Sequence, residues 1–136
     1  MATSNYLKAQ NFGFNIPTDE IINGILVEIE RNSNASNAVK DTNVKIVKAD
    51  GTIGTTNKAD TSIFWPTTDT YKSYGGSSDL WGETWTYANI NDADFGVVLN
   101  VEGTSGVARV DHIRITITYG AVAGYSEPQT QVIILD

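Results

Sequence analysis

The segment VDHIRITITY, residues 110–119, has the most regular strand pattern in the chain. From residue 112 onward polar and apolar side chains alternate, and this period of two residues is typical of a β-strand with one buried face. The apolar face would carry Ile113, Ile115, Ile117 and Tyr119. Val110 is out of phase with this set, which predicts a β-bulge near Asp111.

Other segments show related patterns. Residues 25–31 are apolar at every second position, which predicts another half-buried strand. The dipeptide Asp50-Gly51 is a hairpin-turn signal because glycine adopts positive φ at little cost. Further strands are predicted at residues 12–16, at 44–46, at 95–101 as a central strand buried on both faces, and near Tyr71 as an edge strand.

Turn signals at intervals of about 8–12 residues are typical of β-sandwiches and jelly rolls. We therefore predict an all-β fold, a single β-sandwich or jelly roll of about eight strands. Residues 1–119 would form the sandwich, and residues 120–136 a C-terminal extension that ends in a strand. One helical turn is predicted at residues 88–94, with Asn89 or Asn91 as its cap.

The composition is acidic and free of cysteine. The 136 residues include 9 basic and 16 acidic side chains, a net charge of −7, which disfavours binding to nucleic acid or to anionic membranes. The absence of cysteine excludes disulfides and thiol chemistry. The N-terminus lacks the basic and apolar regions of a signal peptide, and no apolar run approaches the ~20 residues of a membrane span. We expect a soluble protein made in a host cytoplasm.

Catalytic motifs are missing from the sequence. His112 is the single histidine and lies on the polar face of its predicted strand. Asp111 is its neighbour in sequence, so on a regular strand the two side chains would point to opposite faces and form no dyad. No nucleophile elbow or phosphate-binding loop is present. We predict a protein that is not an enzyme, with no catalytic or cofactor-binding residues and no cofactor.

Four oxygen-bearing side chains lie close together in the sequence and are weak candidates for a hard cation such as calcium: Asn89, Asn91, Asp92 and Asp94. Their spacing does not match an EF-hand loop. Clusters of this kind are more often turns and helix caps, so no metal is predicted.

The aromatic residues between 64 and 95 allow two interpretations. Trp65, Tyr71 and Tyr74 are candidates for a protein interface, and aromatic side chains of this kind could also stack on a glycan. A core role is favoured for Trp81, Trp85 and Phe95.

The chain ends in an apolar strand pattern, Val132, Ile133, Ile134 and Leu135. An open sheet edge is a liability, and this strand would cover one. It could do so within its own chain or by donation to a neighbouring copy, and the sequence leaves both open. These four residues are therefore interface candidates.

Several separated motifs carry a resemblance to a known family. They include Phe12-Gly13-Phe14-Asn15-Ile16-Pro17, Asp79-Leu80-Trp81-Gly82 and the segment Val110-Asp111-His112-Ile113-Arg114-Ile115-Thr116. In this order, over roughly residues 5 to 119, the chain resembles a β-sandwich domain that recurs in the virion proteins of tailed bacteriophages and prophages. Longer relatives carry a further strand before Tyr6, which this chain lacks, and the chain adds the tail 121–136.

The resemblance implies a phage virion structural protein at the virion surface. A capsid decoration (cement) protein comes first, followed by a minor head or tail-surface protein. Its partners would be other virion proteins, major capsid or tail, and copies of itself. The alternatives are a receptor- or glycan-binding module of a tail fibre and a filament subunit assembled by strand donation.

Overall fold

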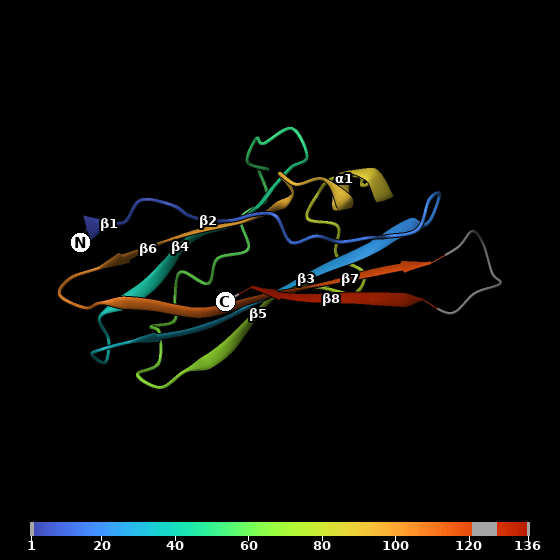
Figure 1. The fold of residues 1–136 in the computed structure, drawn as a ribbon. Coiled ribbons are helices and arrows are strands. Elements are labelled where there is room, and N and C mark those ends of the chain that lie inside the picture. Colours follow the sequence, from blue (N-terminus) through green and yellow to red (C-terminus); the bar gives the residue numbers. More distant parts are fainter. Residues whose placement is uncertain (1, 121–127, 136) are drawn as a thin grey trace.

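The computed structural model of the chain describes residues 2–120 and 128–135. These residues form two antiparallel sheets of four strands each, which pack face to face (Figure 1). The all-β sandwich predicted from the sequence is confirmed. No helix in the described part of the chain is long and apolar enough to cross a lipid bilayer.

Sheet A is organised around strand β6, Gly96–Gly103. Strand β4, Val39–Val47, pairs with one side of β6. Two short strands, β1 (Ala2–Thr3) and β2 (Leu7–Ala9), pair with the other side. The prediction of a central strand at residues 95–101 is therefore confirmed.

Sheet B has the order β5-β3-β7-β8. Its strands are β5 (Thr70–Gly76), β3 (Ile21–Ser33), β7 (Ala108–Gly120) and β8 (Gln129–Leu135). Strand β8 pairs with β7 of its own chain along its whole length, so it belongs to the sandwich. Residues 121–127 and 136 of the predicted extension lie outside the described residues.

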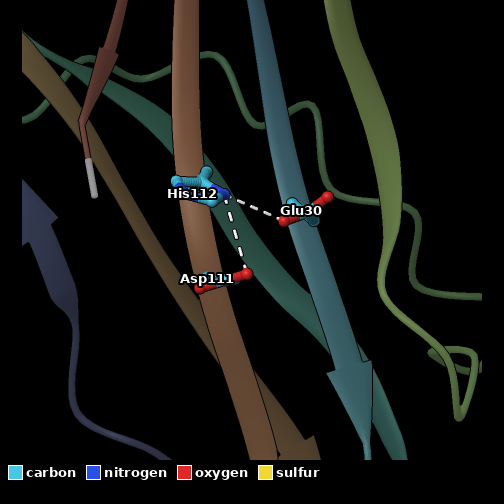
Figure 2. A group of neighbouring side chains, drawn as sticks. All are labelled: Glu30, Asp111 and His112. Atoms are coloured by element: carbon cyan, nitrogen blue, oxygen red, sulfur yellow. Dashed lines mark hydrogen bonds and ion pairs between the residues drawn. The ribbon is translucent and has the colours of Figure 1, made fainter.

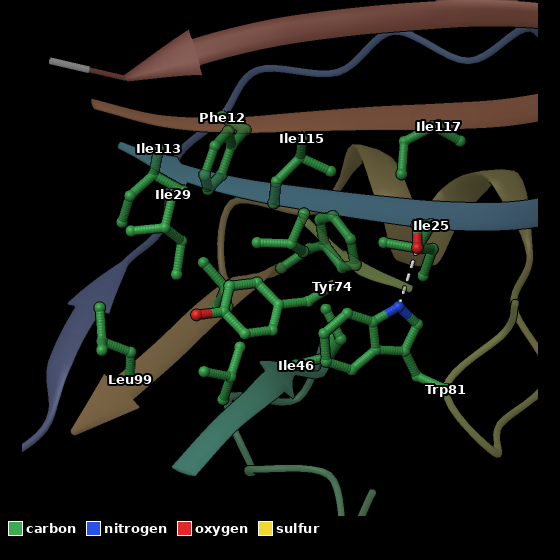
Figure 3. Close-up of a cluster of buried hydrophobic side chains, with 14 of the residues drawn as sticks. Phe12, Ile25, Ile29, Ile46, Tyr74, Trp81, Leu99, Ile113, Ile115 and Ile117 are labelled. Carbon is green, nitrogen blue, oxygen red and sulfur yellow. Dashed lines mark hydrogen bonds between the residues drawn. The ribbon is translucent and has the colours of Figure 1, made fainter. Parts of the chain in front are cut away.

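The core lies between the two sheets (Figure 3). Ile25 and Ile29 of β3 and Ile115 and Ile117 of β7 have no exposed surface. Trp81 belongs to the same cluster, and its Nε1 donates a hydrogen bond to the carbonyl oxygen of Ile25 at 2.9 Å. Alternation along β3 and β7 thus places their apolar side chains inside, as the sequence predicted.

The predicted bulge near Asp111 is present. Glu30 pairs with His112 and Arg31 pairs with Val110, so Asp111 is an extra residue on β7. A bulge of this kind bends its strand and changes the direction of the side chains beside it.

The segment at residues 12–16 is not a strand, which corrects the sequence prediction. Phe12, Phe14 and Ile16 are buried and alternate with exposed residues, yet the segment pairs with no strand. It connects β2 in sheet A to β3 in sheet B, and Asn11 and Gly13 have positive φ angles that interrupt a regular ladder. Its apolar side chains fill the space between the sheets.

The predicted helical turn forms one residue earlier than expected, as α1, Tyr87–Asn91. Thr86 is the N-cap, so the prediction of an asparagine cap was wrong. Asn89 lies inside the helix, where its side chain accepts from the Thr86 N–H at 2.9 Å while the Thr86 hydroxyl accepts from the Asn89 N–H at 3.2 Å. This reciprocal pair is a capping box, which fixes the start of the helix.

Alanine substitutions at two glycines, one crowded and one open, test how tightly the sandwich is packed. A Cβ atom on Gly96 would lie 1.9 Å from the carbonyl oxygen of Ala9, whereas one on Gly76 would meet no atom within 4 Å. We expect Gly96→Ala to lower the free energy of unfolding by about 1–3 kcal/mol, because β2 must move away from β6. Gly76→Ala should stay within about 0.5 kcal/mol of the parent chain in urea unfolding. Equal losses in both variants would contradict this packing.

Candidate functional site

A buried carboxylate links the two sheets. Asp41 of β4 has no exposed surface. Its Oδ1 accepts hydrogen bonds from Arg31 Nη1 at 2.8 Å and Trp65 Nε1 at 2.7 Å. Its Oδ2 accepts from Tyr74 Oη at 2.7 Å and from the Asp60 N–H at 3.2 Å. A buried charge is tolerated when it is paired and hydrogen-bonded in this way.

This network corrects the interface assignment of Trp65 and Tyr74. Both were predicted as interface candidates, but they are 2% and 3% exposed because Asp41 holds their polar atoms in the interior. The Arg31 guanidinium lies 5.0 Å from the centre of the Trp65 ring. Burial, reinforced by the charge of Asp41, raises the pKa of Tyr74 well above its usual range, so the phenol remains a hydrogen-bond donor.

The same network anchors a loop that covers the outer edge of β4. Trp65 and Asp60, which both bond to Asp41, belong to the connection between β4 and β5. This loop bonds to β4 at several points: Gly54 N–H to Ile46 O, Lys58 N–H to Val44 O, and Trp65 N–H to Val39 O. Covering an edge with a loop prevents it from pairing with another chain.

Two further sheet edges are protected against pairing with another chain by features of their own strands. On the far side of sheet A, β1 and β2 have two and three residues, too short to offer a long template. In sheet B, β5 carries the charged Lys72 and ends in Gly75 and Gly76. Charged side chains, glycines and short length all weaken an edge strand as a partner for a foreign strand.

Strand β8 is protected less than the other edges. The side chain of Gln131 accepts from the Asn15 N–H at 3.0 Å and donates to the Asn15 carbonyl at 2.7 Å, but these bonds leave the backbone edge of the strand unpaired within the described residues. Strand β8 ends sheet B, and within the described part of the chain its backbone pairs with β7 and with no other strand. Its seven residues, Gln129–Leu135, include no charged side chain and no proline or glycine. An uncharged edge strand of this length, apolar in its second half, is a template for pairing with a further strand.

The four C-terminal interface candidates divide between the two faces of β8. Val132 and Ile134 lie on the outer face and are 52% and 49% exposed. Ile133 and Leu135 are partly buried and pack against the core. The apolar surface available to a partner therefore belongs to Val132 and Ile134, beside the open edge.

The outer face of sheet B also carries an ordered ion pair. Arg114 Nε and Nη2 donate to the two oxygens of Glu28, each at 2.9 Å. The Arg114 guanidinium lies 4.3 Å from the ring centre of Tyr71, the remaining interface candidate. Register places Arg114 beside Ile134 of β8. The hydrogen bonds to Glu28 raise the pKa of Arg114, so its positive charge is fixed on this face.

A second polar cluster lies on the same face (Figure 2). His112 Nδ1 lies 2.9 Å from Glu30 Oε1 and 3.7 Å from Asp111 Oδ2. The sequence predicted Asp111 and His112 on opposite faces, and this was wrong. The bulge at Asp111 breaks the strand alternation and brings both side chains to one side.

The four weak metal candidates lie in and after α1. Asn89 is engaged in the capping box. Asn91 accepts from the Ile16 N–H at 2.7 Å and donates to the Ile16 carbonyl at 3.0 Å. Asp92 accepts from the Asp94 N–H at 2.9 Å, as in a turn. The structure therefore gives three of these side chains roles in a cap, a turn and the docking of the segment before β3.

The predicted core aromatics occupy the interior to different degrees. Trp81 and Phe95 are buried, at 2% and 0% exposure. Trp85 is half-buried and meets the Phe95 ring edge-on, with ring centres 5.6 Å apart. Trp65 is also buried, so the three tryptophans form no exposed platform for stacking on a sugar ring.

An open cleft of about 420 Å³ lies beside β2 and is lined by residues of β2, β6 and β7. Among the described residues that line it there is no Asp, Glu, His, Lys or Arg. The walls are mainly apolar and include Leu7, Leu99 and Val110. The cleft lacks a charged acid–base group of the kind that general acid–base catalysis requires.

Comparison of the chain with family models, with curated proteins and with solved structures finds no match. What the chain does must therefore be inferred from its own residues.

Removal of the Asp41 side chain tests the network. We expect Asp41→Ala to lower the free energy of unfolding by about 3–5 kcal/mol, because Arg31 would remain charged and buried without its partner. Glu83→Ala is the matched control, since it removes a carboxylate from an exposed pair, 3.8 Å from Lys48. That variant should lose less than about 1 kcal/mol in the same urea titration. Similar losses would show that the Asp41 network does not hold the sandwich together.

Proposed function

We propose that the chain is a structural subunit of a larger assembly and that it acts by pairing with copies of itself through β8. The observation that supports this proposal is the contrast among the sheet edges. The edge of β4 is covered, and β1, β2 and β5 are short or interrupted by charge and glycine, whereas β8 is uncharged and, among the described residues, its backbone pairs with β7 alone.

A second copy of the chain suits this edge better than an unrelated partner, because β8 can form backbone hydrogen bonds with an identical strand. Two identical strands can pair antiparallel about a two-fold axis, and each then satisfies the outward N–H and C=O groups of the other. Each chain has a net charge of −7, which opposes close approach elsewhere on the surface. Strand β8 has no charged side chain, so its pairing would bring no like charges into register.

Side chains beside the edge add to the backbone pairing. Val132 and Ile134 of the two copies would approach each other on the outer face of the joined sheets. Burial of this apolar surface contributes about 25 cal/mol per Å² before ordering costs are subtracted. We therefore expect a modest affinity, strengthened where many copies are held on one surface.

The setting that we propose is the surface of a phage virion. The resemblance of residues 5–119 to virion β-sandwich domains supports this setting, with a capsid decoration protein first and a minor head or tail-surface protein next. The mechanism is binding to copies of itself and to a major capsid or tail protein. Repeated copies on a shell would supply the local concentration that edge pairing needs.

Two alternative functions receive less support. A glycan-binding module needs at least two exposed aromatic rings in one plane, and Trp65, Trp81 and Tyr74 are each 3% exposed or less. A filament built by strand donation would require β8 to leave β7, with which it pairs from Gln129 to Leu135.

A charge on the outer face of β8 tests the self-pairing. We expect Ile134→Lys to abolish concentration-dependent association, measured by sedimentation velocity, because the two copies would bring lysines together beside the shared edge. Ile63→Lys is a matched control, since Ile63 is equally exposed, at 49%, but lies in the loop before β5. That variant should associate as the parent chain does. A parent chain that stays monomeric up to millimolar concentration would overturn the proposal.

The virion setting is tested separately. Gold-labelled antibodies against the chain should mark virus particles released by cells that encode it, when the particles are viewed by electron microscopy. Unlabelled particles would refute the virion setting and leave the self-pairing of β8 unaffected.

A further inference from the structure

The cluster of Glu30, Asp111 and His112 combines three groups that bind metals (Figure 2). It joins β3 and β7, since Glu30 and His112 are partners in the ladder. Each side chain offers one ligand atom, and these three atoms all lie within 4.8 Å of one another. The side chain of Glu30 is 20% exposed, that of Asp111 55% and that of His112 33%, so an ion can reach them from solvent.

We propose that Glu30, Asp111 and His112 form a binding site for a divalent transition-metal ion, with Zn²⁺ as the ion of choice. This inference is independent of the proposed function. Imidazole nitrogen with carboxylate oxygen is a donor set typical of zinc and its neighbours, whereas calcium and magnesium take oxygen ligands. Water would complete a four-coordinate shell around three protein ligands.

The distances suit such an ion. Zinc bonds of about 2.0–2.2 Å in a tetrahedron separate neighbouring ligand atoms by roughly 3.3–3.5 Å. The His112 Nδ1 distances of 2.9 Å to Glu30 and 3.7 Å to Asp111 fall on either side of that value. Small side-chain rotations would therefore bring all three atoms into a coordination sphere without moving the strands.

The bulge is what builds the site. On a regular strand Asp111 would point away from His112. The extra residue in β7 turns its carboxylate toward the imidazole, so that Asp111 and Glu30 of β3 both lie beside His112. Bulges recur where a strand must redirect a side chain for a function.

The nearby Arg114 does not occupy the carboxylates of Glu30 and Asp111 by hydrogen bonds, so both can bind a metal ion. The guanidinium of Arg114 lies on the same face, but its Nε and Nη2 both donate to Glu28. Glu30 Oε1 lies 2.9 Å from His112 Nδ1, and Glu30 and Asp111 bring two carboxylates to the same imidazole. The net charge of the chain, −7, also favours a cation.

The test is a Zn²⁺ titration of the full chain without an affinity tag, followed by NMR of the histidine ring. His112 is the single histidine, so its ring signals need no assignment. We expect these signals to move and to saturate at one Zn²⁺ per chain. The midpoint of thermal unfolding should rise at the same time, because the ion binds the folded state.

Variants separate a three-ligand site from a lone histidine. Glu30→Gln and Asp111→Asn should each weaken Zn²⁺ binding by roughly 10–100-fold. Asp19→Asn is the matched control, since it removes an exposed carboxylate from the turn before β3 and should leave the affinity unchanged. Ring signals that do not move at millimolar Zn²⁺ would overturn the proposal. An unchanged affinity in Glu30→Gln or Asp111→Asn would also overturn it.

Discussion

The buried carboxylate of Asp41 is the interaction on which the rest of the structure depends. It lies on sheet A and receives hydrogen bonds from Arg31 and Tyr74 of sheet B and from Trp65 in the connecting loop. A charge without exposed surface is stable only with such partners, so the carboxylate fixes the two sheets and the loop together. Apolar burial supplies most of the driving force for packing the sheets. The hydrogen bonds of Asp41 fix the position of sheet A relative to Arg31 and Tyr74 of sheet B.

The position of that loop closes one edge of the sandwich. Because Trp65 and Asp60 are held at Asp41, the segment between β4 and β5 lies along β4 and bonds to its outer edge. The other edges are short or interrupted, whereas β8 is seven residues long and uncharged, with its apolar side chains at Val132–Leu135. The Asp41 network thus closes the β4 edge, and β8 is the edge at which we propose that another copy pairs.

The sequence was informative where local periodicity decides structure. The alternation around Ile25 and Ile115 predicted buried strands, and the phase change at Val110 predicted the bulge. It failed where distant residues decide. The burial of Trp65 depends on Asp41, 24 positions away, and no local pattern shows this. The orientation of Asp111 toward His112 follows from the predicted bulge, but the consequence of that bulge for the two side chains was missed. Virion location and partners remain predictions because they depend on molecules outside the chain.

Backbone hydrogen exchange, measured at low and at high protein concentration, tests the central claim most directly. If β8 pairs with β8 of a second copy, its amides that point away from β7 are exposed in the monomer and protected in the associated form. We expect these amides to exchange markedly more slowly at high concentration while the amides of β5, at the opposite edge of the same sheet, are unchanged. Exchange in β8 at one rate over the whole concentration range would contradict the assignment of this edge as the site of assembly.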